Sequence, residues 1–248
     1  MQRPLSAALI AFIAIMLPVP APAQAPESDF GPPEPQPTPR IDPCRLGWVP
    51  EFAPPGADSF VSDFAVFDDG TGPAVYATGF FTSIGDVIAR GIAKWNGTRW
   101  EEVGGGLHRQ GTAVLGAALA TYDDGTGTAL YVIGNFTEAG DLPVNNIAKW
   151  NGSAWSTLGN GLRGAFLFAT LYVHDDGNGA QLYAGGSFDQ VDGQPSVGLA
   201  RWNGQSWDFV GSSFDVAAAF AFATFDDGSG PALYAAGRFM LDGARYGV

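Results

Sequence analysis

The 248-residue sequence contains a single cysteine, Cys44, and only two histidines, His108 and His174. One cysteine cannot form an intramolecular disulfide, so a hydrophobic core must stabilise the fold. A zinc or copper enzyme needs two or three converging ligands, and two histidines at unrelated positions do not supply them. Disulfide scaffolds and histidine-rich metalloenzymes are therefore disfavoured.

Basic residues are also scarce. The sequence has 12 Lys and Arg residues against 25 Asp and Glu residues, which gives a formal net charge of −13. The basic residues form no cluster anywhere along the chain. Since nucleic acids and anionic membrane surfaces are bound through clustered positive charge, we expect neither as a partner.

Long apolar runs are confined to the N-terminus. A basic start at Arg3, an apolar run from Leu5 to Leu17 and the small residues AQA at 23–25 are typical of a signal peptide over residues 1–25. No later segment approaches the roughly 20 consecutive apolar residues of a membrane helix. We therefore expect no membrane insertion and a secreted, periplasmic or cell-surface location.

Proline is abundant in one stretch only. Residues 26–45 include PESDFGPPEPQPTPRIDP and are predicted to be an extended linker. Cys44 lies in this stretch, away from the apolar run, and is predicted to be a free thiol. The folded part is expected to begin at residue 46.

The remaining chain is a repeat. Four related segments, FDDGTGPAVY, YDDGTGTALY, HDDGNGAQLY and FDDGSGPALY, place their aspartate pairs 55, 52 and 51 residues apart. Tryptophan pairs recur in the same phase at Trp95 and Trp100, Trp150 and Trp155, and Trp202 and Trp207, and Trp48 fits the second position of an earlier pair. The predicted units lie near 46–100, 101–155, 156–207 and 208–248, and the last one is partial.

Each unit is predicted to contain four strands. In the second unit these cover residues 115–122, 129–136, 146–150 and 154–158, with a DDGTG corner between the first two and Asn-Gly between the last two. A two-residue Asn-Gly turn would pair Trp95 with Thr98, which makes Trp95 and Trp100 diagonal neighbours on one face.

A glycine and a tyrosine also recur at fixed positions. Each glycine follows its tyrosine by three residues, where a side chain would obstruct a neighbouring backbone. The tyrosines are predicted to pack in the core or between units. The glycines are Gly79, Gly134, Gly186 and Gly237, and the tyrosines are Tyr76, Tyr131, Tyr183 and Tyr234.

Four antiparallel strands per unit, a period near 50 and a large aromatic face together indicate the blades of a β-propeller. The segment ALYVIGNFTEAGDLPVNNIAKWNGSAWSTLGNGL, residues 129–162, resembles kelch-like repeats, most closely the secreted type in fungal cortical polarity proteins and in bacterial exported proteins. The double glycine of kelch repeats occurs only as Gly185-Gly186. The expected fold is all-β, with about four blades and the last one incomplete.

The blade count leaves two alternatives. A strand around Trp48 could complete a small four-bladed ring, or the sequence could be part of a larger propeller. The final unit stops at GRFMLDGARYGV without its KWNG segment and second tryptophan. This favours truncation.

The repeated aspartate pairs are candidate metal ligands, and calcium is the metal considered. An aspartate that begins a turn accepts backbone N–H bonds, and the glycines supply positive φ, so no metal is needed there. Calcium requires six to eight oxygen ligands, and its DxDxDG spacing is absent. We therefore favour hairpin corners over calcium sites. The candidates are Asp68, Asp69, Asp123, Asp124, Asp175, Asp176, Asp226 and Asp227.

No catalytic motif is recognisable, and His174 occupies a position that is aromatic in the other repeats. The predicted function is a non-catalytic binding or surface-display module that holds a protein or glycan at one rim or at the axis. One alternative is an extracellular carbohydrate-active or oxidising enzyme with catalytic residues in the non-repeated loops. Another is a truncated propeller without independent function.

Overall fold

The computed structural model describes residues 56–111, 114–196, 198–210, 215–228, 230–241 and 244–247. The chain divides into two compact units, Met1–Trp48 and Val49–Val248, and all described residues belong to the second. The predicted signal peptide, the whole predicted linker with Cys44, and Trp48 therefore lie outside the described residues. In the part that is described, no helix is long and apolar enough to cross a membrane.

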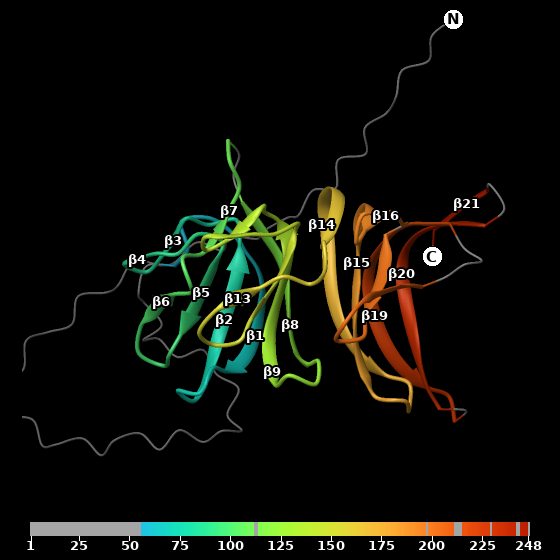
Figure 1. Ribbon diagram of the computed structural model, residues 1–248, viewed down its shortest axis with the longest axis horizontal. Coiled ribbons are helices and arrows are strands. Elements are labelled where there is room, and N and C mark those ends of the chain that lie inside the picture. The colour runs from blue at the N-terminus through green and yellow to red at the C-terminus, as the bar shows by residue number, and fades with distance from the viewer. Residues whose placement is uncertain are drawn as a thin grey trace, which may run out of the picture. The chain divides into compact units, whose positions relative to one another are not determined.

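The described residues form antiparallel sheets and no helix, which confirms the all-β class (Figure 1). The first sheet has the order β1-β2-β5-β6, the second β13-β12-β9-β8, the third β14-β15-β17-β18 and the fourth β19-β20-β21. The strands of the first and second sheets are β1 Val61–Asp68, β2 Pro73–Gly79, β5 Ile92–Trp95, β6 Trp100–Glu102, β8 Leu115–Asp123, β9 Thr128–Asn135, β12 Ile147–Trp150 and β13 Trp155–Ser156.

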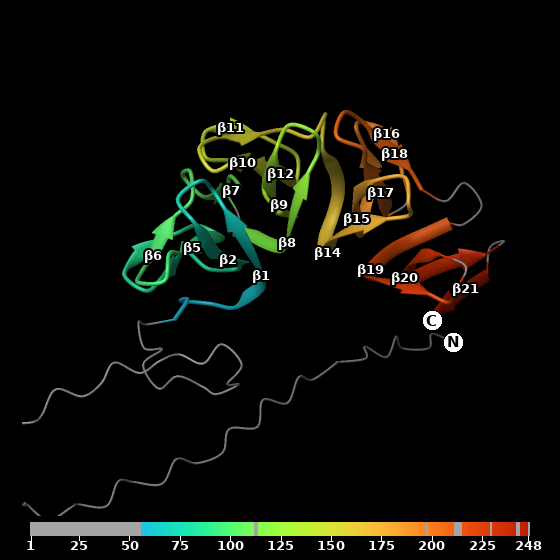
Figure 2. The same cartoon turned by 90° about the horizontal axis from the view of Figure 1, so that it is seen from below.

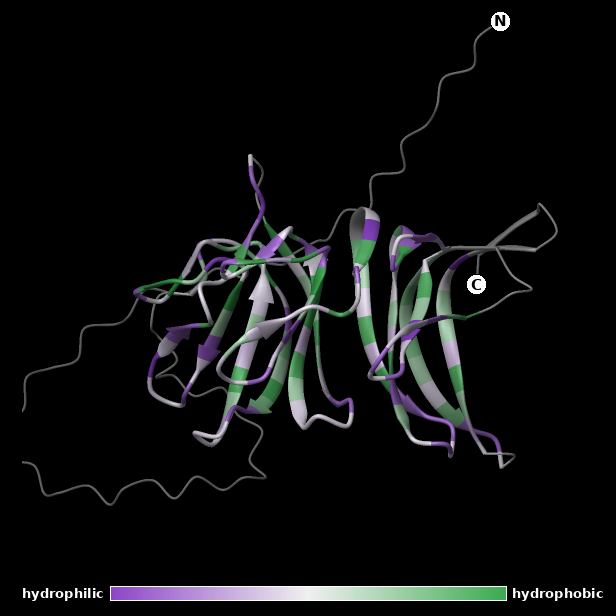
Figure 3. Cartoon of the chain, viewed as in Figure 1, coloured by the Kyte–Doolittle hydropathy of each residue, from purple (hydrophilic) through white to green (hydrophobic). Residues whose placement is uncertain are grey.

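The third sheet has long first and second strands. Its strands, with those of the fourth sheet, are β14 Leu162–Asp175, β15 Ala180–Val191, β17 Leu199–Trp202, β18 Trp207–Phe209, β19 Asp215–Asp226, β20 Pro231–Leu241 and β21 Ala244–Gly247. The short strand β16 Gln194–Pro195 pairs with β15. Apolar residues follow the strands, and hydrophilic residues gather at many of the turns (Figure 3).

The DDG corners are tight hairpins whose first aspartate caps the turn. In the second sheet, Asp123 pairs with Thr128 across the corner, and its Oδ1 atom accepts the backbone N–H groups of Gly125 and Gly127. Both glycines have positive φ, at 91° and 112°. The same two-glycine cap occurs at Asp68, Asp175 and Asp226.

The repeated glycine lies where the first strand approaches the second strand closely. A Cβ atom on Gly134 would lie 2.0 Å from the carbonyl oxygen of Leu115, beside an irregularity in the β8–β9 pairing. On Gly79 it would lie 2.3 Å from the carbonyl oxygen of Phe60, directly before β1. On Gly237 and Gly186 it would lie 2.2 and 2.7 Å from a carbonyl oxygen of the first strand. Glycine is therefore required by packing within each sheet.

The Asn-Gly hairpins differ from the prediction, because the loop has four residues and not two. Trp95 pairs directly with Trp100, and the Asn96 backbone N–H donates to the carbonyl oxygen of Arg99. The Asn96 side chain accepts the N–H groups of Thr98 and Arg99, which stabilises the wider turn. The tryptophans are thus opposite each other, with ring centroids 5.5, 5.0 and 5.3 Å apart in the three hairpins.

Several short strands were not predicted from the sequence. Besides β16, those between the second and third strands of a sheet are β3 Ser83–Ile84, β4 Val87–Ile88, β10 Glu138–Ala139 and β11 Leu142–Pro143, and β7 Leu107–His108 lies between β6 and β8. β3 pairs with β4, and β10 lies between β7 and β11. Because β7 pairs with β10 and the Leu107 N–H donates to the carbonyl oxygen of Arg90, this small sheet links the first two repeats.

The four main sheets stand side by side in chain order (Figures 1 and 2). One face of each sheet carries the repeat tyrosine and the residue before the aspartate pair, and we call it the tyrosine face. The opposite face carries the tryptophan pair, where one is present, and we call it the tryptophan face. Tyr76 of the first sheet shares a buried cluster with Trp150 of the second. Tyr131 of the second sheet shares another with Trp202 and Trp207 of the third. Tyrosine faces therefore pack against tryptophan faces.

The interface between the third and fourth sheets is more polar. His174 is buried, its ring lies 6.1 Å from that of Tyr183, and its Nδ1 atom hydrogen-bonds Thr224 Oγ1 over 2.9 Å. The predicted packing role of His174 agrees with this position. Tyr234 is 51% exposed and differs from the other repeat tyrosines, because no further sheet covers the fourth one among the described residues.

The first strands of all four sheets meet at one cavity. It has a volume of about 370 Å³ and is lined mainly by apolar residues of β8, β14 and β19 and by residues next to or within β1. The lining residues are Phe60, Ser62, Leu115, Ala117, Phe168, Ala169 and Phe220. We call it the axial cavity, and the described residues close no complete ring around it.

Candidate functional site

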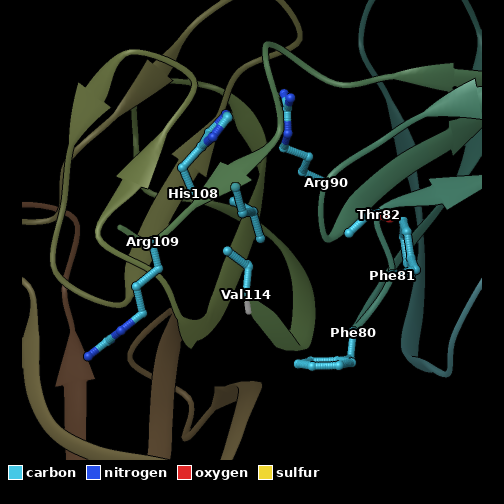
Figure 4. A pocket seen from close by; sticks show the side chains of 8 residues that line it. Phe80, Phe81, Thr82, Arg90, His108, Arg109 and Val114 are labelled. Carbon is cyan, nitrogen blue, oxygen red and sulfur yellow. The ribbon is translucent and has the colours of Figure 1, made fainter. Parts of the chain in front are cut away.

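A cleft near β7, with a volume of about 260 Å³, combines aromatic and basic side chains (Figure 4). We call it the rim cleft. Four parts of the chain contribute to it: the segment after β2, Arg90 shortly before β5, the strand β7 with the residue that follows it, and Val114 just before β8. They are Phe80, Phe81, Thr82, Arg90, Leu107, His108, Arg109 and Val114.

Backbone hydrogen bonds hold the walls of the rim cleft. The Leu107 N–H donates to the carbonyl oxygen of Arg90 over 2.8 Å, and the Gly91 N–H donates to that of Phe81 over 2.9 Å. The carbonyl oxygen of His108 accepts the N–H of Thr137 over 2.8 Å. These bonds tie the segments from both repeats together, so the cleft has a defined framework.

Side-chain contacts orient the polar groups. Nε2 of His108 hydrogen-bonds the carbonyl oxygen of Gly105 over 2.7 Å, and the Arg109 guanidinium donates to Asn135 Oδ1. In Figure 4, Arg90 and His108 extend toward one side of the cleft, and Arg109 extends the other way. Arg90 is exposed, whereas His108 and Arg109 are half-buried.

Positive charge is unusual in this acidic chain, and most described cations outside the cleft are already paired. Lys94, Lys149 and Arg201 each form an ion pair with an aspartate. Arg90 and Arg109 form no ion pair with another described residue. The cleft therefore offers guanidinium donors that suit a carboxylate or another anion.

An aromatic surface extends from the rim cleft toward the axial cavity. Phe80 is 38% exposed and stacks on Phe60, with ring centroids 5.6 Å apart and planes 9° from parallel. Phe60 is 56% exposed and lines the axial cavity. Exposed aromatic rings beside hydrogen-bond donors are suited to bind a sugar ring or an apolar side chain.

The predicted metal ligands lie at hairpin corners that gather at the lower edge of Figure 1. The two aspartates of a pair turn to different partners. Asp68 caps backbone N–H groups, whereas Asp69 bonds Thr71, Tyr76 and Lys94. Over the described ranges, no three His, Cys, Asp or Glu side chains are grouped to hold a metal ion. Calcium binding at these corners stays the less favoured interpretation of the sequence.

A buried charge cluster at the corners was missed by the sequence analysis. Nζ of Lys149 lies 2.6 Å from Asp124 Oδ2 and 2.7 Å from Thr126 Oγ1, and the Tyr131 hydroxyl donates to Asp124 Oδ2 over 2.9 Å. Lys94, Asp69, Thr71 and Tyr76 repeat this arrangement in the first sheet. The available signal was a lysine 25 residues after the second aspartate in both repeats.

The cluster shifts the pKa values of its members. Burial alone would raise the pKa of Asp124, but hydrogen bonds from Lys149, Thr126 and Tyr131 lower it to about 2. The pKa of Asp69 is lowered for the same reasons. Burial and the neighbouring carboxylate raise the pKa of Tyr131. The cluster is thus a neutralised, stabilising unit with no free acid or base.

The repeat tryptophans join neighbouring sheets. Trp155 Nε1 donates to the carbonyl oxygen of Gly104 over 2.9 Å, and Trp207 Nε1 donates to that of Leu158 over the same distance. Trp95 and Trp100 are partly buried on the tryptophan face of the first sheet. These residues build the architecture and lie outside the rim cleft.

No family model matches the chain, and no match was found among the curated proteins or the solved structures. The resemblance to kelch-like repeats therefore depends on the residue pattern alone.

Proposed function

We propose that this chain is an exported, non-catalytic β-propeller-type module that binds a protein or glycan carrying an anionic group. The observation that carries the proposal is the rim cleft, where Arg90, His108 and Arg109 lie beside the exposed ring of Phe80. Basic donors next to an aromatic ring favour recognition of an acidic sugar or a carboxylate-bearing side chain.

The arrangement of the sheets supports a propeller-type architecture. β1, β8, β14 and β19 are the first strands of their sheets, and residues in or beside them line the axial cavity. Each sheet packs one face on the next, as blades do. The kelch-like pattern of KWNG, Leu-Tyr and the paired tryptophans agrees with this assignment.

A binding role fits the chemistry of the described residues better than catalysis. His108 and His174 lie apart, one at the rim cleft and the other between the third and fourth sheets. The best-buried carboxylates, Asp69 and Asp124, are held by lysine ion pairs. His108 lines the cleft without a carboxylate among the other lining residues, so no acid–base pair is presented to a ligand there. The N-terminal pattern around Arg3 predicts export.

The test is a binding screen with the full chain on an array of neutral and uronate-bearing oligosaccharides and of acidic and neutral peptides. We expect retention of acidic probes, weakened by salt. Arg90→Ala should lower affinity for the best probe by about 10-fold, since a guanidinium–carboxylate pair is lost. The matched control is Arg99→Ala, because Arg99 is exposed on a hairpin, pairs with Glu101 and does not line the cleft.

Two results would overturn the proposal. One is equal binding by the Arg90 and Arg99 variants, which would move the ligand away from the rim cleft. The other is turnover of any oligosaccharide on the array, which would favour the carbohydrate-active alternative.

A further inference from the structure

The described residues contain two complete copies of one interface between sheets. In each, the tryptophan pair of one sheet covers the tyrosine face of the preceding sheet. A Cβ atom on Gly152 would lie 2.8 Å from the carbonyl oxygen of Asp69, and one on Gly204 would lie 2.5 Å from that of Asp124. The Asn-Gly turn of one sheet thus rests directly on the DDG corner of the sheet before it.

The tryptophan face of the first sheet carries the same tryptophan pair, but among the described residues no other main sheet covers it, and only the short β3–β4 hairpin packs against part of it. Trp100 is only partly buried, and a Cβ atom on Gly97 would meet nothing within 4 Å. A cavity of about 550 Å³ lies on this face and is lined chiefly by Val61, Phe64, Val75, Ile84, Trp95 and Trp100. Phe64 is 58% exposed. An apolar surface of this kind marks an interaction site.

The fourth sheet carries the other half of this interface, a tyrosine face that no other described sheet covers. Phe225 and Tyr234 form the same ring pair as Tyr122 and Tyr131, with centroids 6.1 Å apart. Phe225 is 59% and Tyr234 51% exposed, whereas Tyr122 and Tyr131 are 6% and 0% exposed beneath the third sheet. The corner at Asp226 is capped as in the other repeats.

We propose that the tryptophan face of the first sheet binds the tyrosine face of the fourth sheet of a second copy of this chain. The two faces are the halves of an interface that the chain already forms twice within itself. Because one copy carries one half of each kind, the contact is heterologous and joins copies head to tail.

The test uses the full chain, the variant Trp100→Asp to block the first face and the variant Tyr234→Asp to block the second. We expect the unmodified chain to associate as its concentration rises in sedimentation velocity, with each variant alone monomeric. An equimolar mixture of the two variants should form a one-to-one dimer, because each retains one competent face. Phe209→Asp is the control, since Phe209 is 54% exposed and lies on neither face.

A second pair, Phe64→Asp and Phe225→Asp, repeats the experiment at exposed positions in case either first variant fails to fold. Acrylamide quenching of tryptophan fluorescence should fall on association in the unmodified chain. If the unmodified chain stays monomeric at all concentrations up to about 100 μM, the proposal is overturned, because a specific contact with a Kd below that value would have formed. Quench-protected tryptophans in such a monomer would indicate that another part of the same chain covers the face, and this also overturns it.

Discussion

The corners of the second and third sheets have nearly the same sequence, yet their charges pair differently. In the second, Lys149 reaches Asp124 and Thr126. In the third, Arg201 occupies the lysine position but bonds Asp208 on the next strand, over 2.8 Å. An ammonium is a compact point charge, whereas a guanidinium is a planar fork. Lys149 faces Ser156 on the next strand, whereas Arg201 faces Asp208, so the residue on that strand and the shape of the cation together decide which carboxylate is neutralised.

The neighbouring sheet adds to this difference. Trp202 and Trp207 cover the tyrosine face of the second sheet, and Tyr131 there is completely buried. The third sheet faces Thr224 of the fourth, which bonds His174 and Tyr172. A repeated sequence thus produces an apolar, charge-neutralised interface at one position and a polar interface at the next.

The largest expected effect comes from removing a tryptophan that is covered on the preceding sheet. Trp207→Ala should lower the free energy of unfolding by about 3–5 kcal/mol, because it leaves a cavity and removes the bond to Leu158. Trp100→Ala changes the same hairpin position on the uncovered face and should cost about 1–2 kcal/mol. Urea denaturation at low protein concentration measures both, and equal losses would contradict the difference in burial.

The charge cluster should give the next largest effect. Asp124→Asn leaves the buried Lys149 without its counter-charge and should cost about 3 kcal/mol. Asp176→Asn is the matched change in the third sheet, where the carboxylate accepts only from Asn178 at an exposed corner. That variant should have a melting temperature close to that of the unmodified chain. Similar losses in both variants would show that Lys149 does not distinguish the corners.

Acid should weaken the second corner. The pKa of Asp124 is lowered from 3.8 to about 2, so the folded state favours the carboxylate. The stabilisation is present above pH 4 and is lost as the pH falls toward 2, by about 2 kcal/mol. The stability gap between the unmodified chain and Asp124→Asn should therefore narrow by that amount between pH 5 and 2. A constant gap would contradict this.

The smallest effect should come from the turn glycines. Gly97 and Gly152 have φ values of 95° and 99°, so alanine imposes the same backbone strain at both. Only at Gly152 would the added Cβ atom press on the preceding corner, 2.8 Å from the Asp69 carbonyl oxygen. Gly152→Ala should thus cost about 1–2 kcal/mol more than Gly97→Ala in thermal or urea unfolding. Equal costs would show that the sheets do not contact through this turn.

Much of the fold could be predicted because its signals are local. The DDG corners, the strands on either side and the glycine near each tyrosine follow from turn chemistry and alternating apolar residues. The tryptophan register was wrong because Asn96 accepts two N–H groups and widens the loop. Tyr234 was predicted to be packed, and its exposure depends on a neighbour that no local pattern reveals.

The candidate site could not be predicted in the same way. Phe80, Arg90 and Arg109 are not part of the repeat, and they meet where β7 bonds to the carbonyl oxygen of Arg90. The lysine of KWNG was recognised as part of a motif, but its partner lies 25 residues earlier in the chain. The cleft depends on how neighbouring sheets are placed, and the lysine contact depends on how strands pair within one sheet.

The sequence by itself determined the all-β class, the repeat period and the hairpin corners, since hydrogen bonds within a few residues of each aspartate or asparagine specify them. The tertiary structure alone decided which face of each sheet is covered, which cation meets which aspartate and where the rim cleft forms. The ion pairs depend on how strands pair within a sheet, and the covered faces and the cleft depend on packing between sheets, where burial is set by neighbours up to about a full repeat away.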